Sequence, residues 1–294
     1  MDLRGKKAVV LGGESGLLGQ ALMHALDDAG ALALGTSRTI LDPLDNAALT
    51  AFLDREEPDL LFNTVAYTQV DLAEEEPDQA MRVNAGLPKR LGRLSEEQGF
   101  QLIQYSTDFV FDGRKEGFYT EEDEPCPLSV YGKTKLQGER ALLGNPAPGL
   151  LVIRTAWLFG PGRSNFVHKI LKMACEKESL SIVHDQIGSP TYTVDLAKHS
   201  LQLIGAGAVG LYHVTNGGRA SWCELAAEAI SVAGLDCRVE AIPSSAYPAK
   251  ATRPANSLLD NAKFTAATGV TPRPWAQALR EYVYTDMATK CVAD

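Results

Sequence analysis

The stretch Gly13-Glu14-Ser15-Gly16-Leu17-Leu18-Gly19 follows a short apolar run, Lys7 to Leu11, and opens a segment with helical periodicity. This G-x-x-G-x-x-G spacing predicts a tight turn between a strand and a helix, because glycines let two backbone segments approach closely. The same turn would admit a pyrophosphate to the free N–H groups of the helix N-terminus. A structural turn alone would need the same glycines, but its place between the first strand and the first helix favours dinucleotide binding.

Apolar runs of strand length alternate with longer helical stretches through the first half of the chain. This rhythm is typical of βαβ units around a parallel sheet, and it predicts a Rossmann-type, doubly wound α/β fold. The expected strands are Lys7 to Leu11, Ala31 to Thr36, Leu60 to Asn63, Gln101 to Ser106 and Leu150 to Arg154. The expected helices are Leu17 to Ala29, Leu44 to Arg55, Gln79 to Glu97 and Tyr131 to Leu143. Ligands of such a sheet bind at the carboxyl ends of its strands.

The second half has a looser pattern, with Gly160-Pro161-Gly162, Ser189-Pro190 and Asn216-Gly217-Gly218 separating shorter elements. We therefore expect a dinucleotide-binding domain over residues 1–154 and a smaller, mainly substrate-binding region over 155–294. Part of 190–215 is expected to return to the first domain, because Leu211 to Val214 has the character of another strand of its sheet.

Composition narrows the classes of partner. The 294 residues carry a net charge of −9, which argues against a broad electrostatic grip on nucleic acid or on an anionic membrane surface. The five cysteines are odd in number and form no C-x-x-C pair, so neither a disulfide framework nor a zinc site is indicated. The histidines lack metal-ligand spacing, and no metal ligands are assigned. The N-terminus lacks the apolar segment of a signal peptide, so we expect a cytoplasmic protein.

The end of the second expected strand bears on the type of dinucleotide. An NAD site usually has an acidic residue there to bind the ribose hydroxyls, whereas this chain has Thr36-Ser37-Arg38. Arg38 would pair with the 2′-phosphate of NADP, so NADP(H) is expected to be preferred over NAD(H). The alternative is a solvated surface arginine.

Tyr131 and Lys135 lie four residues apart and would share one face of a helix. A cation near a phenol favours the phenolate, which would bring proton transfer within reach at neutral pH. Thr107 follows the fourth strand and could hydrogen-bond a reacting carbonyl. Each feature alone is common, since Y-x-x-x-K occurs by chance and Ser-Thr-Asp often forms a turn. Together with the glycine loop, in this order, they are far more specific.

With these residues, the chain resembles the extended short-chain dehydrogenases/reductases over nearly its whole length, and within them the dTDP-4-dehydrorhamnose reductases. The supporting segments in the first half are Asn63-Thr64-Val65-Ala66-Tyr67-Thr68 with Val70-Asp71, Val83-Asn84-Ala85, Ser106 to Gly113, and Tyr131 to Lys135 followed by Gly138-Glu139. Those in the second half are Arg154-Thr155-Ala156-Trp157, Asn165-Phe166, Asp185-Gln186-Ile187-Gly188-Ser189-Pro190-Thr191 and Arg253 to Ser257.

The resemblance implies an oxidoreductase in which NAD(P)H delivers hydride to C4 of dTDP-4-dehydro-L-rhamnose, giving dTDP-L-rhamnose. Tyr131 would donate the proton, Lys135 would tune Tyr131 and hold the ribose, and Thr107 would help match the acidity of the substrate. The implied cofactor contacts are Gly13, Gly16, Leu17, Leu18, Gly19, Arg38, Leu41, Asp42, Ala66, Tyr67, Thr68, Tyr131 and Lys135. The implied substrate contacts are Thr107, Asp108, Trp157, Asn165 and Arg253.

Several of these residues have plainer interpretations. Trp157 would equally suit a core or an interface, and Arg253 would suit a helix cap or a solvated position. Glu74, Glu75 and Glu76 are interpreted as a solvated helix face. Some members of the resembled family bind magnesium at a dimer contact through acidic residues, which are not mapped in this chain. A magnesium requirement and a homodimer are therefore left open.

Two other functions remain as alternatives. A dehydratase or epimerase would share the glycine loop and Tyr131, but dehydratases of this type carry an acid directly after the Thr-Asp pair, where this chain has Phe109. A noncatalytic NADP-binding regulatory subunit would share the fold, because fold alone does not define function. Retention of Tyr131, Lys135 and Thr107 together argues against it.

Overall fold

A six-stranded parallel sheet forms the centre of the protein in the computed structural model, which describes residues 2–287. The strands run in the order β10-β5-β4-β3-β1-β2, and every neighbouring pair is parallel. Their bounds are β1 (Lys7–Leu11), β2 (Leu32–Gly35), β3 (Leu60–Asn63), β4 (Gln101–Thr107), β5 (Leu151–Thr155) and β10 (Gly210–His213). The predicted doubly wound α/β fold is confirmed. Strand order reverses between β1 and β3, which is where such sheets bind their ligands.

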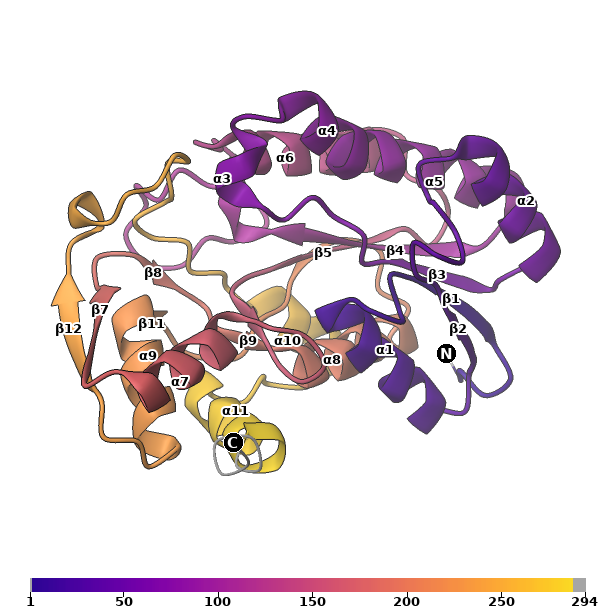
Figure 1. Cartoon of the computed structure of the whole chain (residues 1–294). Helices are drawn as coiled ribbons and strands as arrows, with labels where there is room; N and C mark the ends of the chain where they lie inside the picture. Colours follow the sequence, from indigo (N-terminus) through magenta and orange to yellow (C-terminus); the bar gives the residue numbers. More distant parts are fainter. Residues whose placement is uncertain (1, 288–294) are drawn as a thin grey trace.

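Helices cover both faces of this sheet (Figure 1). One layer holds α2 (Asn46–Glu56), α5 (Leu87–Gln98) and α6 (Val130–Leu143), and the other holds α1 (Leu17–Asp28), α8 (Thr193–Gly205) and α10 (Ala262–Thr268). Alternate residues of β1 serve the two layers: Val9 packs with α2 and α5, whereas Val10 packs with α1 and α8. Burial on both faces explains why the inner strands β1 and β3 are almost continuously apolar.

The predicted helix Gln79 to Glu97 is wrong as a single element. The chain instead forms α4 (Pro77–Met81), a π-helical turn η1 (Arg82–Gly86) and then α5. Pro88 cannot donate a backbone hydrogen bond to the carbonyl of Asn84, so the helix widens at that point. Helix α6 lies close against the freed carbonyl, because a Cβ on Gly138 would fall 2.2 Å from Asn84 O.

The helix predicted over Leu44 to Arg55 begins two residues later, at Asn46. The Asp45 carboxylate accepts hydrogen bonds from the backbone N–H groups of Ala47 (2.9 Å) and Ala48 (3.0 Å). This side-chain cap fixes the helix start because it satisfies two of the otherwise unpaired donors of the first turn.

The second half of the chain builds a smaller body beside the sheet, at its left in Figure 1. Its core is formed by α7 (Phe166–Glu176), α9 (Trp222–Val232) and α11 (Trp275–Tyr282), with the strand pair β7 (Ser179–Val183) and β12 (Arg238–Ile242). Residues 193–213, which lie between β7 and α9 in the sequence, return to the large sheet: α8 packs on α1 and β10 pairs with β5. The remaining short elements are α3 (Val70–Ala73), η2 (Asp108–Val110), β6 (Leu158–Phe159), β8 (Ile187–Gly188), β9 (Thr191–Tyr192), β11 (Ala220–Ser221), η3 (Ser244–Ala246) and η4 (Val283–Met287).

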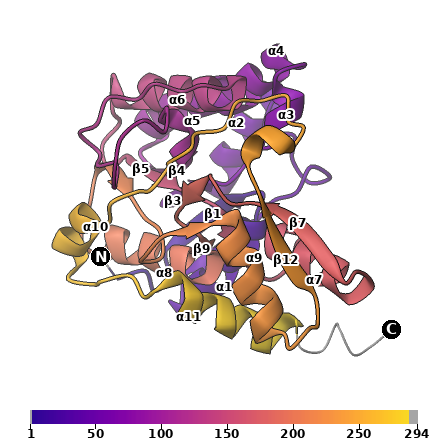
Figure 2. The ribbon, with the colours of Figure 1, turned by 90° about the vertical axis from the view of Figure 1, so that its left-hand side faces the viewer.

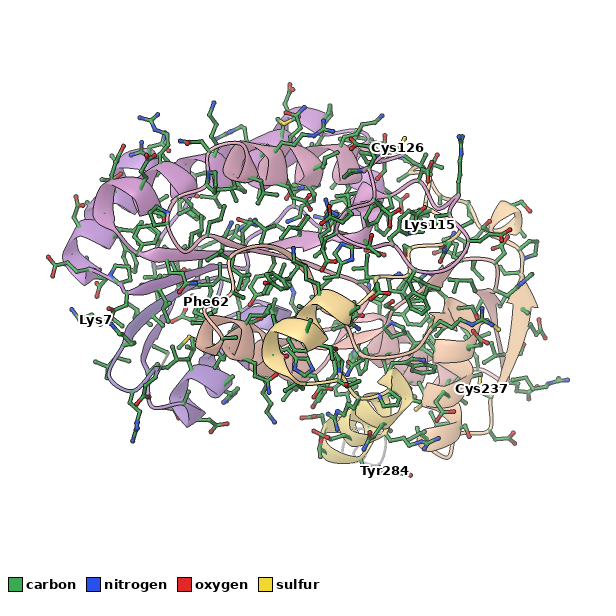
Figure 3. The ribbon with its side chains drawn as sticks, turned by 180° about the vertical axis from the view of Figure 1, so that it is seen from behind. Lys7, Phe62, Lys115, Cys126, Cys237 and Tyr284 are labelled. Atoms are coloured by element: carbon green, nitrogen blue, oxygen red, sulfur yellow. The ribbon has the colours of Figure 1, made fainter. Side chains whose placement is uncertain are left out.

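Surface and interior separate clearly in Figure 3, where Phe62 lies inside the body while Lys7 and Tyr284 lie at its periphery. Cys126, Cys223 and Cys237 carry free thiols, and Cys291 lies outside the described residues. Within residues 2–287, no helix combines the length and the apolar character needed to cross a bilayer. In the same residues, no three His, Cys, Asp or Glu side chains gather in a way that could hold a metal ion.

Candidate active site

The glycine loop between β1 and α1 is built on contacts that exclude side chains. A Cβ on Gly19 would lie 2.3 Å from the carbonyl oxygen of Gly12, and one on Gly16 would lie 2.7 Å from the same atom. Gly13 packs on Gly35 of β2 with a corresponding distance of 2.7 Å. Gly12 itself has φ +82°, a left-handed conformation that favours glycine. The predicted loop of Gly13, Gly16 and Gly19 did not include Gly12, although the Gly12-Gly13 pair in the sequence could have indicated it.

The N-terminus of α1 faces this loop and is suited to a diphosphate. Gly16 is the N-cap and has no side chain to accept from the first turn, and that turn contains no acidic residue. Its backbone donors and positive dipole end therefore match a bound anion. Leu18 is buried in the core, so its side chain is directed away from such a ligand.

Beyond β2, the chain turns at Ser37 and carries Arg38 at an exposed position. Leu41 is buried against α2, and the Asp42 carboxylate accepts a hydrogen bond from the backbone N–H of Leu44 at 3.0 Å. Leu41 thus anchors the segment after β2 in the core, while the exposed Arg38 is available to a ligand at the surface.

The residues after β3 are held by Asn84 of the π-helical turn. Asn84 Oδ1 accepts from the backbone N–H of Tyr67 (2.9 Å), and its Nδ2 donates to the Tyr67 carbonyl (3.2 Å) and to Thr134 Oγ1 of α6 (3.1 Å). Asn84 therefore ties the segment that contains Ala66, Tyr67 and Thr68 to the helix that carries Tyr131. Asn84 stands in one of the segments that resemble the family, but nothing in its sequence surroundings predicted this role.

Thr107 and Asp108 lie where β4 ends, and both are buried. Thr107 Oγ1 donates to Asp108 Oδ1 (3.0 Å) and accepts from the Phe109 backbone N–H (3.2 Å). Burial raises the pKa of Asp108 to about 6, although hydrogen bonds with Ser257 and Thr107 oppose the rise. A carboxyl with this pKa changes charge near physiological pH, so it can accept a hydrogen bond from a ligand in one state and donate one in the other.

Tyr131 reaches Thr107 because α6 approaches η2 very closely. A Cβ on Gly132 would lie 2.2 Å from the Phe109 carbonyl oxygen, so the helix could not take this position with a larger residue. The Phe109 ring meets Tyr131 edge-on at 5.5 Å between centroids. Burial raises the pKa of Tyr131 to about 12, with the Asp108 charge adding to the rise and a hydrogen bond with Thr107 opposing it.

This pKa differs from the expectation that Lys135 lowers it in the free protein. The Lys135 ammonium instead donates to the Tyr105 carbonyl of β4 at 2.7 Å. Desolvation lowers the pKa of Lys135 to about 8, while the Glu139 carboxylate counteracts this effect. The spacing of the two side chains was predictable from a helix, but the direction of the ammonium depends on where β4 lies.

Trp157 and Asn165 both contact the smaller body. The indole of Trp157 stacks on Trp222 with centroids 3.5 Å apart, and its backbone has φ +48°, which is unusual for a bulky residue. Asn165 caps α7, with Oδ1 accepting from His168 N (3.2 Å) and Nδ2 donating to Gly160 O (2.8 Å) and Tyr282 Oη (3.1 Å). These bonds occupy the Asn165 amide, and its contact with substrate stays a prediction.

Arg253 forms a two-pronged ion pair with Asp71 of α3. Its Nη2 lies 2.7 Å from Asp71 Oδ2 and its Nη1 lies 3.1 Å from Oδ1. The backbone N–H groups of Lys250 and Ala251 also donate to Asp71, each at 3.0 Å. These bonds bring residues 250–253 of the second half against α3, as Figure 2 shows for the segment that follows η3.

Glu75 and Glu76 are exposed, as predicted for a solvated face, but residues 74–76 lie between α3 and α4 rather than on a helix, and each glutamate makes a specific contact. Glu74 Oε1 accepts from the Val130 backbone N–H at the start of α6 (2.9 Å), and Glu76 Oε2 accepts from Tyr67 Oη (2.7 Å). Glu75 pairs with Lys250. Val130 and Lys250 are distant in sequence and Tyr67 lies outside any helix, so periodicity gave no signal for these partners.

A glycine loop at the switch point of a parallel sheet, together with Thr107 at the end of β4 and with Tyr131 and Lys135 on α6, is typical of the class of nicotinamide-dependent short-chain dehydrogenases/reductases. Residues 7–287 match the family described as the RmlD substrate binding domain, and the chain belongs to this family.

Known relatives extend over nearly the whole chain. It is 39% identical over 276 residues to the dTDP-4-dehydrorhamnose reductase of Streptomyces griseus, and the alignment covers 92% of this chain and 90% of the relative. A solved dTDP-4-dehydrorhamnose reductase from Clostridium acetobutylicum is 35% identical, with TM-score 0.90 and coverage of 95% and 98%. The enzyme of the same name from Bacillus anthracis, solved with NADP, is 29% identical, with TM-score 0.91 and coverage of 95% and 99%.

Proposed function

We propose that this protein reduces the C4 ketone of dTDP-4-dehydro-L-rhamnose with NADPH, giving dTDP-L-rhamnose, and that Tyr131 donates the proton. The observation that carries the proposal is the meeting of Tyr131 with the Thr107–Asp108 pair at the ligand-binding edge of the sheet. Residues 1–154 with part of 190–215 would bind the cofactor, and 155–294 would mainly bind the sugar nucleotide.

The cofactor fits the glycine loop because Gly16 and Gly19, whose lack of a Cβ lets the Gly12 backbone pack directly on them, keep the start of α1 free of side chains. The N–H groups at the start of α1 would hold its diphosphate, and Arg38 would hold the 2′-phosphate of NADP. Leu41 and Asp42 would lie near the adenine, and Ala66, Tyr67 and Thr68 near the nicotinamide. When bound, NADPH supplies the hydride that adds to C4.

Tyr131 supplies the proton that balances this hydride. Its pKa of about 12 keeps the phenol protonated at neutral pH, as a proton donor requires. The Tyr131 O–H bond breaks as the C4 oxygen gains its proton, and solvent restores the phenol afterwards. Thr107 would hydrogen-bond the carbonyl oxygen, while the Lys135 ammonium would stabilise the phenolate and hold the ribose hydroxyls.

The substrate would lie across the gap between the two bodies. Asp108 would contact sugar hydroxyls, and the Trp157 ring would form an apolar wall beside them. Arg253 would reach the diphosphate if its pairing with Asp71 opens. A positive group near the diphosphate is useful because the rest of the chain is strongly acidic.

Phe109 favours reduction over dehydration. A dehydratase needs an added acid after Thr107 and Asp108, whereas Phe109 packs edge-on against Tyr131 and offers no proton. A regulatory, noncatalytic role is disfavoured because such a protein would have no use for Tyr131 set against the Thr107 hydroxyl on the same helix as a buried Lys135.

The test is NADPH oxidation by the purified protein with dTDP-4-dehydro-L-rhamnose, followed by chromatography of the product. We expect oxidation that depends on the substrate, one dTDP-L-rhamnose per NADPH and slower turnover with NADH. A 4-keto sugar nucleotide of opposite configuration at C5 serves as the control for substrate choice. Absence of oxidation by folded protein that binds NADPH would refute the proposal.

A further inference from the structure

A buried ion pair lies one helical turn beyond Lys135. Glu139 of α6 accepts from Arg154 of β5 through both oxygens, with Oε1 2.9 Å from Nε and Oε2 2.6 Å from Nη2. The two side chains are only 2% and 3% exposed. Such a pair is costly to bury and is often replaceable by apolar residues without loss of stability, so stability alone explains it poorly.

The position of Glu139 relates it to Lys135. Residues four apart on a helix lie on one face, and Lys135 and Glu139 line the same small space together with Ser106 of β4. Lys135 is 5% exposed, and burial of an ammonium without a nearby negative charge favours its neutral form. Glu139 is the residue whose charge opposes this loss.

The other ionisable groups around Lys135 do not replace Glu139. Tyr131 on α6 is protonated, and Tyr105 of β4 offers Lys135 its carbonyl oxygen. Asp108 in η2 faces Thr107. The charged residues of the other elements packed on α6 do not supply such a charge. Asp71 pairs with Arg253, and Arg90 is half-buried and donates to Thr50. The others are exposed: Asp78, Arg82, Lys89, Arg93, Glu96 and Glu97.

Arg154 is itself held in place by aromatic and imidazole groups. Its guanidinium lies 5.1 Å over the Phe111 ring, and its Nη1 lies 3.4 Å from His213 Nε2. Burial and the Arg154 charge lower the pKa of His213 to about 3, so His213 is neutral at physiological pH and adds no second cation beside Arg154.

We propose that Glu139, fixed by Arg154, is a positioning residue that keeps the buried Lys135 ammonium charged and directed at the Tyr105 carbonyl. The idea rests on the proposed function, because a charged Lys135 matters only if it serves Tyr131 and a cofactor ribose. Glu139 touches neither substrate nor cofactor in this scheme and acts through Lys135.

Glu139→Gln tests the idea because glutamine keeps the size and one oxygen for Arg154 while removing the charge. The variant also leaves the Arg154 charge uncompensated near Lys135. We expect the pKa of Lys135 to fall from about 8 by about 1, the lower end of the effect of a neighbouring charge. The direct measurement is a pH titration of the ¹³Cε signal in protein labelled at lysine, with the Lys135 signal assigned from Lys135→Met.

Activity gives a second measurement. The high-pH limb of kcat/KM is expected to move down with the Lys135 titration, so the loss in Glu139→Gln is about tenfold at pH above the wild-type pKa and small at pH 6. A loss that is the same at every pH would indicate a purely structural role and would overturn the proposal, as would an unchanged Lys135 titration.

Asp195→Asn is the matched control. Asp195 also forms a two-pronged pair, with Arg273 at 2.7 and 2.8 Å, but it lies on α8 away from Lys135. Its loss should lower stability and leave the Lys135 titration unchanged. If Glu139→Gln does not fold, Glu139→Leu with Arg154→Met removes both charges together, and the pKa of Lys135 should still fall below its wild-type value.

The two proposals fail separately. A shifted Lys135 titration in a protein that does not reduce the sugar nucleotide would leave the role of Glu139 standing and refute the proposed function. An active enzyme with an unshifted titration would do the reverse.

Discussion

Replacing Gly19 by alanine tests whether the loop between β1 and α1 is built as described. The added methyl would lie 2.3 Å from Gly12 O, 2.8 Å from Gly12 C and 2.9 Å from Gly13 Cα. All three are backbone atoms, so no flexible side chain can move aside. Overpacking of this kind costs about 1–3 kcal/mol, which corresponds to a fall in Tm of about 2–12 °C for a domain of this size.

The same displacement should weaken cofactor binding, because the loop and the first turn of α1 must both reach the diphosphate. A loss of about 1.4 kcal/mol raises the Kd for NADPH about tenfold, and we expect at least that much. Thermal unfolding with and without NADPH, together with a fluorescence titration of NADPH, measures both effects.

Gly86→Ala is the control for a glycine without such contacts. Its φ is −62° and the nearest atom to an added Cβ is Met81 O at 3.8 Å, so alanine should be neutral or stabilising by up to about 1 kcal/mol. If Gly19→Ala matches wild type in both Tm and NADPH affinity, the packing argument for the loop is refuted.

Two further variants test single side chains. In His213→Gln, the free energy of unfolding should lose part of its pH dependence. The pKa of His213 is about 3 in the folded protein and 6.5 in the unfolded chain, so the unfolded chain binds a proton first as the pH falls. Below pH 6.5 the wild type should therefore lose about 1.4 kcal/mol of stability per pH unit relative to the variant. Urea unfolding from pH 7 to pH 4 measures this difference, and parallel curves would contradict it. In Arg38→Ala, the KM for NADPH should rise about tenfold or more through loss of a charge-assisted hydrogen bond, while the KM for NADH stays unchanged. An equal effect on both cofactors would show that Arg38 does not bind the 2′-phosphate.

Much of the sheet was predictable because each strand carries its own apolar signal. Strands β1 and β3 begin and end at the predicted residues, and β10 follows the run that begins near Leu211. The glycine loop was predictable for a similar reason, since its spacing is local. Asp45 fixed the start of α2 two residues later than expected because a side-chain cap overrides periodicity.

The rest depends on packing between distant segments. The π-helical turn Arg82–Gly86 follows from Pro88, but the close contact of the Asn84 carbonyl with Gly138 depends on where α6 packs. The role of Gly132 likewise requires the Phe109 carbonyl to be in place. Arg253 was interpreted as a substrate contact, a helix cap or a solvated residue, because its partner Asp71 lies 182 positions away.

The pKa of Tyr131 was missed in direction for the same reason. A helix predicts that Lys135 lies near Tyr131, but burial of the phenol and the Tyr105 carbonyl that binds Lys135 depend on β4. Spacing gives proximity, whereas the local dielectric and competing hydrogen bonds decide the sign of a pKa shift.

The role of Tyr131 is tested most directly by substrate-dependent NADPH oxidation in Tyr131→Phe. Phenylalanine keeps the ring against Phe109 and removes only the hydroxyl, so NADPH binding and Tm should stay close to wild type. Loss of a general acid typically costs about 10²–10⁴-fold, and we predict a fall of kcat within that range. Turnover by Tyr131→Phe within a few-fold of wild type would contradict the account.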